Sequence, residues 1–353
     1  MSRFWVDKVS SLRPYVPGEQ PVGQAVVKLN TNEHALPPSD AVMSAISSLA
    51  GEALRRYPDP TSSLLRSAIA IRESLSAEQV FVGNGSDEVL AHLWAACLAN
   101  RPVASVDITY GFYPVWSQLY GSTLTQCPLR DDFSIDVDAL LDVQGAVVLA
   151  NPNAPTGLAL TRWQIETLVA ANRNRLVVID EAYYGFGAET AAPLINDYDN
   201  LVVTRSLSKS HSLAGMRVGY ALASPLLVDG LGRIRDSFNS YPLDAVAQAA
   251  ATAAIQDVEW FARASKVVIE SRKSMIDGLL EMGFEVLPSQ ANFIFTRPGR
   301  GSGLGLFDAL RQRNILVRRW ESPRISDWLR ISVGTPEQTQ ALLGAVGEIL
   351  ESS

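Results

Sequence analysis

The sequence predicts an α/β protein, with a large domain whose mostly parallel central sheet is flanked by helices and a smaller α+β domain at the C-terminus. The first observation is a series of short apolar runs, several of them separated by helical stretches, that begin near residues 79, 102, 146, 176, 201 and 218. The second is that polar motifs follow most of these runs, at the strand ends where such sheets bind their ligands. The third is a change after Gly278 to short strands that alternate with helices.

Composition bounds the class of protein. The chain has 353 residues, of which 47% are hydrophobic and 19% charged, as in a globular protein with a large core. A net charge of −7 without a Lys/Arg-rich run argues against nucleic acid as a partner. We expect no membrane span, no signal sequence and a cytoplasmic location, because no apolar run approaches about 18 residues. Cys97, Cys127 and the scattered histidines lack metal-ligand spacing, so we expect no metal site.

Residues 1–35 are expected to form an N-terminal arm and part of the small domain. Prolines and glycines that disfavour helices and strands occur along the arm, at Pro14, Pro17, Gly18, Pro21 and Gly23. Arms of this kind often pack on a partner subunit. Residues 26–30 are a short strand, and the polar run Asn30-Thr31-Asn32-Glu33 that ends it either caps local backbone or faces a pocket.

The large domain is expected over residues 36–244, beginning with a helix that Ser39 caps. Two prolines, Pro58 and Pro60, hold an extended segment that displays Tyr57, either for packing or for a ligand. After the strand at 79–83, a glycine-rich turn at 84–88 opens a helix whose N-terminus could bind phosphate. Simple helix capping explains the same pattern.

The later strands of the large domain also end in polar residues. Tyr110 follows the strand at 102–106, where an aromatic ring could stack on a planar ligand. The strand at 146–150 runs into the rigid loop Asn151-Pro152-Asn153-Ala154-Pro155-Thr156-Gly157. Asp180 ends the apolar strand at 176–179, and a carboxylate there is costly unless a cation such as a pyridinium nitrogen pairs with it.

The run from Thr204 to Tyr220 carries the most chemistry. Lys209 lies among Ser206, Ser208 and Ser210, and Arg217 follows. Burial or a cationic neighbour would lower the pKa of Lys209 and make it a nucleophile that forms an imine with an aldehyde. Serine hydroxyls and an arginine suit a phosphate, so the combination suggests pyridoxal phosphate. Alone, the loop is equally compatible with an ordinary surface lysine.

Residues 245–353 are expected to supply a linking helix and the small domain. The run from 242 to 276 is helical and alanine-rich, and strands follow near 285, 292, 315 and 328, with a last helix from Pro336. Arg330 lies in the alternating strand near 328–333, where it either pairs with a structural carboxylate or binds an anionic substrate.

Together, six motifs resemble those of the pyridoxal-phosphate-dependent aminotransferases of the aspartate-aminotransferase fold, the type I fold of such transferases. They are S-L-S-K (206–209), L-A-G-M-R-V-G-Y (213–220), D-E-A-Y (180–183), N-P-N-A-P-T-G (151–157), G-N-G-S-D-E (83–88) and W-L-R-I-S-V-G-T (328–335). The resemblance covers nearly the whole chain, and within the family it is strongest to the histidinol-phosphate aminotransferases.

The resemblance implies a set of roles. Lys209 would form the imine and move the proton, Asp180 would pair with the ring nitrogen, and Tyr183 would bond the phenolic oxygen. Gly85, Ser86, Asp87, Ser206, Ser208 and Arg217 would surround the phosphate, with Tyr110 stacked on the ring and Tyr57 reaching the phosphate of the partner in a homodimer. Arg330, Arg318 and Asn32 would bind the substrate. Ala154 replaces the usual asparagine, so Asn153 or Asn151 would have to serve the cofactor instead.

The function implied is transamination between histidinol phosphate and 2-oxoglutarate, with small amines and 2-oxo acids as the only partners besides a second subunit. The segment His34-Ala35-Leu36 lacks the tyrosine that the family often has there. The alternatives are an aromatic amino-acid aminotransferase, a decarboxylase of a phospho-amino acid, and a cofactor-binding module without enzymatic activity.

Overall fold

A computed structural model describes residues 2–20 and 26–352, so Pro21 and Gly23 of the arm lie outside the described residues. The large domain contains a seven-stranded sheet in the order β2-β8-β7-β6-β5-β3-β4, in which β8 alone runs antiparallel to its neighbours. Its strands are β2 (Val80–Asn84), β3 (Pro102–Val106), β4 (Thr123–Cys127), β5 (Ala146–Ala150), β6 (Val177–Asp180), β7 (Leu201–Ser206) and β8 (Val218–Ala223). The prediction of a mostly parallel sheet is confirmed.

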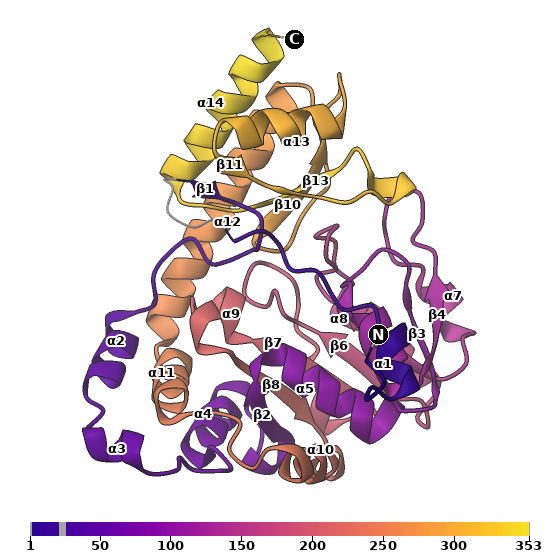
Figure 1. Ribbon diagram of the computed structural model, residues 1–353, viewed down its shortest axis with the longest axis vertical. Coiled ribbons are helices and arrows are strands. Elements are labelled where there is room, and N and C mark those ends of the chain that lie inside the picture. The colour runs from indigo at the N-terminus through magenta and orange to yellow at the C-terminus, as the bar shows by residue number, and fades with distance from the viewer. Residues whose placement is uncertain (1, 21–25, 353) are drawn as a thin grey trace.

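Helices cover both faces of this sheet (Figure 1). They are α2 (Asp40–Ser47), α3 (Gly51–Arg55), α4 (Ser63–Glu73), α5 (Gly85–Leu93), α6 (Phe112–Tyr120), α7 (Val137–Leu141), α8 (Arg162–Ala171), α9 (Leu207–Ser210), α10 (Pro225–Phe238) and α11 (Ala245–Gln256). Alternate strand residues point to opposite faces. Leu149 and Ile179 therefore join the core with α4, α8 and α11, whereas Val148 and Val178 join the core with α5, α6 and α10.

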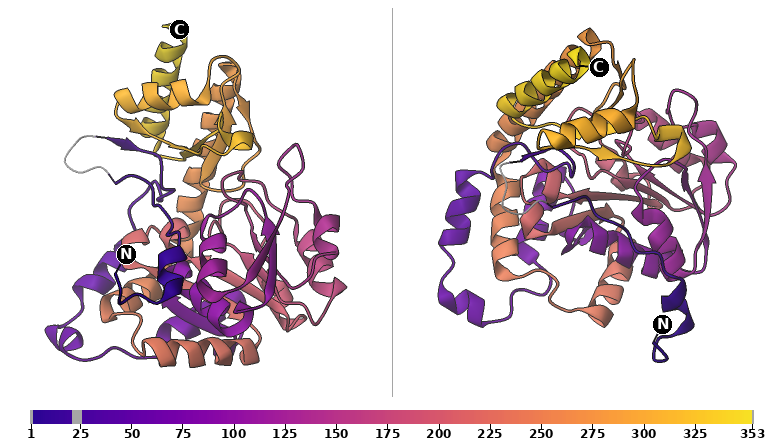
Figure 2. Two further views of the ribbon diagram at one scale, coloured as in Figure 1. Left: turned by 45° about the vertical axis from the view of Figure 1, so that its right-hand side comes forward. Right: turned by 45° about the horizontal axis from the view of Figure 1, so that its top comes forward.

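The small domain is a second layer of sheet and helices joined to the large domain by α12 (Val258–Glu281), as Figure 2 shows. Its antiparallel sheet has the order β12-β13-β10-β9, and β1 pairs in parallel with β11. The elements are β1 (Val27–Lys28), β9 (Glu285–Val286), β10 (Phe293–Arg297), β11 (Ile315–Leu316), β12 (Arg318–Arg319), β13 (Leu329–Ser332), α13 (Gly303–Gln312) and α14 (Pro336–Glu351). The N-terminal segment thus enters the small domain.

The domain boundaries at 35 and 244 stay predictions. α11 lies beyond the second boundary, yet it packs on α2 and α4 of the large domain and contributes Ala250 and Ile255 to its core. The arm itself contains one short helix, α1 (Asp7–Ser11). No helix of the described residues is both long and apolar enough to cross a membrane.

Capping residues and hydrophobic patterns in the sequence predict most of the elements, but they did not predict β4 and α9. Ser39 caps α2 by accepting from the backbone N–H of Val42, as predicted. The helix after Gly85 ends in one wide turn over Trp94–Leu98. β4 was not predicted, because its pattern of exposed polar residues is typical of a loop as well as of an edge strand. The loop around Lys209 was expected to lack regular structure, but it holds the single-turn helix α9.

A buried ion-pair network holds β6 against β7 on the side of the sheet away from the pocket. Arg205 donates to Glu181 at 2.9 Å and to Glu73 at 2.7 Å, and its guanidinium lies 3.6 Å from the ring centre of Tyr184. All three charged side chains are nearly inaccessible to solvent. Because Glu181 follows Asp180 directly, this network fixes the backbone beside the strand ends where the site lies.

Replacing Arg205 by methionine should lower the free energy of unfolding by about 3 to 5 kcal/mol, because two buried carboxylates lose their cation. Urea unfolding of the protein without cofactor measures this. Arg233→Met is the matched control, because Arg233 pairs with Asp229 on the surface and such pairs contribute at most about 1 kcal/mol. Equal unfolding midpoints for the two variants would contradict the expectation.

Candidate functional site

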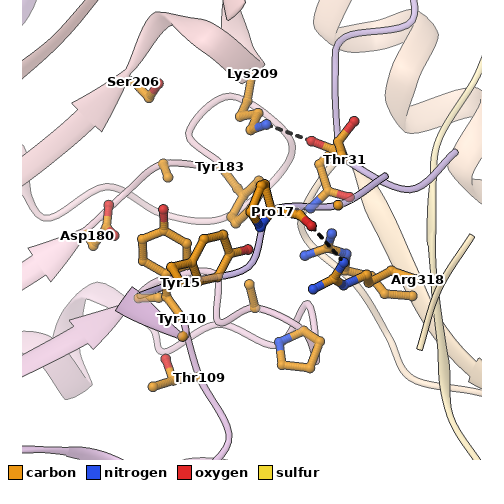
Figure 3. Close-up of a pocket in the computed structure, with 18 of the residues that line it drawn as sticks. Tyr15, Pro17, Thr31, Thr109, Tyr110, Asp180, Tyr183, Ser206, Lys209 and Arg318 are labelled. Atoms are coloured by element: carbon orange, nitrogen blue, oxygen red, sulfur yellow. Dashed lines mark hydrogen bonds between the residues drawn. The ribbon is translucent and has the colours of Figure 1, made fainter. Parts of the chain in front are cut away.

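The motifs at the strand ends meet in a pocket of about 400 Å³ between the two domains. Its walls come from the arm, the large domain and the small domain, and Figure 3 shows Lys209, Asp180 and Tyr183 pointing into it. Most of the predicted site residues line this pocket: Asn32, Ser86, Asp87, Tyr110, Asp180, Tyr183, Ser206, Ser208, Lys209, Arg217, Arg318 and Arg330.

Lys209 lies on α9 with its amine in the pocket. Its Nζ donates to the carbonyl oxygen of Thr31 at 2.8 Å (Figure 3). Burial, together with the positive charges of Arg330 and Arg217, lowers the pKa of Lys209 to about 8, and the charge of Glu33 acts in the opposite direction. The amine is therefore substantially deprotonated just above neutral pH, as a nucleophile or a base requires.

Asp180 is a buried carboxylate without a cationic partner among the described residues. Its oxygens accept hydrogen bonds from the hydroxyls of Tyr113 at 3.0 Å and Thr204 at 3.1 Å. Burial raises the pKa of Asp180 to about 6, although both hydrogen bonds act in the opposite direction. A buried carboxylate that faces a pocket in this state suits a cationic ring N–H, so this part of the site fits pyridoxal phosphate.

An anion cradle lies beside Lys209. The Arg217 guanidinium lies so close to Gly85 that a Cβ on this residue would sit 2.6 Å from Nη2, and Gly85 also has a positive φ of 82°. Arg217 donates to the hydroxyl of Ser208 at 3.2 Å and contacts Asp87 at 3.1 Å. Ser206 and the first turn of α5 complete the cradle, which fits a phosphate group.

Two tyrosines form the walls between lysine and cradle. The hydroxyl of Tyr183 accepts from the side-chain amide of Asn32 at 3.0 Å, and burial raises the pKa of Tyr183. Tyr110 donates to Asp87 at 2.8 Å, which fixes its ring in the pocket wall. Asn32, which was expected to bind substrate, lines the pocket and uses one N–H of its amide to bond Tyr183.

The end of the pocket formed by the small domain carries two arginines, Arg318 and Arg330, that face each other across β12 and β13. Arg330 donates to the carbonyl of Asn30 at 2.9 Å, and Arg318 donates to the arm carbonyls of Val16 and Pro17 at 3.3 and 3.5 Å. Neither arginine forms an ion pair within the described ranges of the chain. Both guanidiniums remain available for an anionic ligand.

The geometry argues against the expected role of Asn153. Both N–H groups of its amide are used, by the carbonyl of Ile108 at 2.9 Å and the hydroxyl of Thr156 at 3.1 Å, and its oxygen accepts from Thr109 at 2.8 Å. Asn151 is likewise bonded to the backbone of Leu160. Asn153 therefore keeps no free donor for a ring oxygen, and neither Asn151 nor Asn153 is among the described residues that line the pocket.

Tyr57 is not brought into the pocket of its own chain. Its side chain is 81% exposed and stacks on Tyr241, with ring centres 4.5 Å apart. Tyr57 lines a separate surface hollow together with Met216 and Arg217. Arg217 also lines the main pocket, so the hollow and the pocket share this residue.

Sequence reasoning missed several residues that line the pocket or hold its side chains in place. Tyr113 and Thr204 hold Asp180, and period-two alternation along β7, with Ser206 in the cradle, could have placed Thr204 on the pocket face. Tyr15 and Trp320 also line the pocket, and Tyr15 stacks on Phe112 with ring centres 4.5 Å apart. No local signal marks these two, because they arrive from opposite ends of the chain.

Known proteins resemble the chain along its length. Residues 24–346 match the family described as aminotransferase class I and II. The histidinol-phosphate aminotransferase of Gluconacetobacter diazotrophicus is 53% identical, over 99% of each chain, and histidinol-phosphate aminotransferase 1 of Bradyrhizobium diazoefficiens is 52% identical, over 99% of this chain and 100% of the relative. The crystal structure of histidinol-phosphate aminotransferase from Sinorhizobium meliloti in complex with pyridoxal-5'-phosphate superposes with a TM-score of 0.90 at 26% identity, covering 100% of this chain and 99% of the other.

Burial of Asp180 should make the protein without cofactor less stable as the pH rises. The folded pKa of about 6 lies above the ordinary value of 3.8, so the folded state binds the extra proton and stability falls between about pH 4 and pH 6. The loss amounts to about 3 kcal/mol. Asp180→Asn should remove this part of the pH dependence in urea unfolding, whereas the exposed substitution Asp277→Asn should not. Parallel curves for wild type and Asp180→Asn would contradict the assignment.

Proposed function

This chain belongs to the class I and II aminotransferases, and we propose that it is a pyridoxal-phosphate-dependent enzyme that transfers the amino group of histidinol phosphate to 2-oxoglutarate. A cofactor-binding module without enzymatic activity would not need a pocket lysine with a lowered pKa, so we favour an enzyme. The proposal rests on the residues that would hold the cofactor and on the two arginines at the substrate end.

The pocket has a complementary group for each polar part of the cofactor. Asp180 would accept the ring N–H, and Tyr183 would donate to the phenolic oxygen. Tyr110 lines the wall against which the ring would lie. The phosphate would be held by Arg217 and by the remaining residues of the cradle: Gly85, Ser86, Asp87, Ser206 and Ser208.

Pyridoxal phosphate, when bound, supplies an electron-withdrawing ring and an aldehyde that carries the amino group between the two half-reactions. Asp180 keeps a negative charge beside the ring nitrogen and so favours the protonated ring. Lys209 has a lowered pKa of about 8 and can take a proton from the substrate carbon and return it. The carbonyl of Thr31 holds the Lys209 amine within the pocket while it carries that proton.

The observation that carries the substrate proposal is the pair Arg318 and Arg330. Two guanidiniums without an ion-pair partner among the described residues match a phosphate, which carries close to two negative charges near neutral pH. An aromatic amino acid offers a single carboxylate and leaves one of these charges unmatched. The relatives named histidinol-phosphate aminotransferase support the same choice.

The loaded enzyme should turn over histidinol phosphate with a kcat/KM at least about 100-fold above that for phenylalanine, because a phosphate can form charge-assisted hydrogen bonds with both arginines and a single carboxylate cannot. Steady-state kinetics with 2-oxoglutarate as acceptor measures both. Arg318→Gln should lower kcat/KM for histidinol phosphate about 10- to 100-fold and change that for phenylalanine much less.

Arg319→Gln is the matched control, because Arg319 neighbours Arg318 on β12 but bonds the carbonyl of Ser326 and does not line the pocket. Lys209→Ala should abolish turnover. Normal turnover by Lys209→Ala would refute the proposed enzyme, and equal kcat/KM values for the two substrates would refute the proposed substrate.

We also propose a homodimer in which Tyr57 enters the site of the partner subunit. Tyr57 lies on a surface with large exposed apolar side chains, Leu54 at 65% and Leu64 at 78%. Such a patch is expected to be covered by another protein surface. The hollow beside Tyr57 leads to Arg217, so a second copy docked there would bring its own Tyr57 towards the phosphate cradle.

Mixing two inactive variants tests this arrangement. Tyr57→Ala should weaken cofactor binding, and Lys209→Ala should be inactive. A hybrid dimer of the two would contain one site with an intact lysine and an intact partner tyrosine, so subunit exchange should restore up to about a quarter of wild-type activity. Light scattering should give about twice the chain mass of 38.3 kDa. A mixture no more active than its components would place Tyr57 outside the partner's site.

A further inference from the structure

Asn32, next to the lysine's acceptor, adopts an uncommon backbone conformation. Its φ is 55°, in the left-handed region that asparagine tolerates better than most residues, and its side chain is buried. This conformation turns the preceding carbonyl, that of Thr31, towards Lys209, which bonds it at 2.8 Å (Figure 3). The same residue sends its side-chain amide to Tyr183 at 3.0 Å. Asn32 thus links the two pocket groups.

Asn32 is held in place from the small domain. Its backbone N–H donates to the hydroxyl of Ser332 at 2.8 Å, and that hydroxyl donates in turn to the side-chain oxygen of Asn32 at 2.8 Å. The side chain of Asn292 donates to the Asn32 carbonyl at 2.9 Å. A single buried hydroxyl on β13 therefore fixes both the backbone and the side chain of Asn32.

We propose that Ser332 is a positioning residue for the reaction, which sets Asn32 so that the Thr31 carbonyl meets Lys209 and the Asn32 amide meets Tyr183. The inference rests on the proposed function, because Lys209 and Tyr183, the two groups that Asn32 aligns, have roles only in that reaction. Ser332 is not among the residues that line the pocket, and in the described part of the chain its hydroxyl bonds Asn32 rather than Lys209 or Tyr183. Its effect passes through Asn32.

This arrangement affects two protons, that of the Lys209 amine and that of the Tyr183 hydroxyl. The Thr31 carbonyl stabilises the protonated amine of Lys209, since a hydrogen bond to a charged donor is stronger than one to a neutral donor. The Asn32 amide polarises the hydroxyl of Tyr183 and makes it a better donor. Without the Ser332 hydroxyl, Asn32 would be free to relax from its left-handed conformation, and both interactions would lengthen.

Ser332→Ala in the full-length, cofactor-loaded protein should lower kcat about 10-fold while KM changes less than about 2-fold, because the lost alignment acts on the proton-transfer step. In the protein without cofactor, the pKa of Lys209 should fall by about half a unit. Labelling with an amine-reactive reagent across pH, read by mass spectrometry, measures this pKa. The pH midpoint of the visible absorbance of the cofactor-loaded protein should also shift, because the Asn32 amide bonds the Tyr183 hydroxyl that would contact the phenolic oxygen.

Ser332→Thr keeps the hydroxyl on a residue suited to a strand and should restore kcat and both pH values. Thr296→Val is the matched control, because Thr296 is fully buried in the same sheet and its hydroxyl donates to the carbonyl of Glu285 at 2.8 Å, away from Asn32. If Ser332→Ala does not fold, Ser332→Cys, which preserves volume but bonds weakly, takes its place.

The proposal is overturned if Ser332→Ala, or its cysteine substitute, leaves kcat and the Lys209 pKa unchanged. It is also overturned if Thr296→Val causes the same losses, since the effect would then be one of stability. If the wild-type protein binds cofactor but does not use histidinol phosphate, the substrate proposal fails, whereas the Lys209 pKa still tests the role of Ser332.

Discussion

The burial of the Asp180 carboxylate is the constraint on which the site depends. The Asp180 carboxylate, at the end of an inner strand, is almost inaccessible to solvent, and in the described residues it has two hydroxyl donors but no cation. The hydroxyls of Tyr113 and Thr204 offset part of this cost. The Arg205 network next to it, on the opposite face of the sheet, pairs every buried charge it contains. Side chains of β6 and β7 alternate between the two faces of the sheet. The Arg205 ion pairs therefore lie on one face, and Asp180, which has no cation among the described residues, lies on the other.

Charge is distributed unevenly between the protein and its pocket. The chain as a whole carries a net charge of −7, yet the pocket gathers Lys209, Arg217, Arg318 and Arg330. Each cation is oriented by a carbonyl or a hydroxyl, and among the described residues Arg217 alone of the four has a carboxylate ion-pair partner, Asp87. Anion binding is therefore a local property, created by residues that the fold brings to one place. Burial is the main cause of the lowered pKa of Lys209, and the positive charges of Arg330 and Arg217 add to it.

The pocket is closed by parts of the chain that lie far apart in sequence. The N-terminal segment pairs with β11 through β1, and then passes over Lys209 with Thr31 and Asn32. The small domain supplies the arginines and the hydroxyl of Ser332. The domains thus share the site, and an interaction in one domain can set the position of a group in the other.

Local sequence determined the strands and the groups at their ends. β3, β5 and β8 have the predicted bounds, because runs of apolar residues without a polar face are compatible only with a doubly covered sheet. Lys209, Asp180 and the glycine-rich turn at Gly85 were recognised because their chemistry is carried by adjacent residues. Tertiary structure alone decided which groups complete them. Asn153 points into its own loop, Thr31 accepts from Lys209, and Tyr113 holds Asp180, and none of these contacts leaves a pattern in the sequence, because each joins segments whose approach depends on the packing of the whole chain.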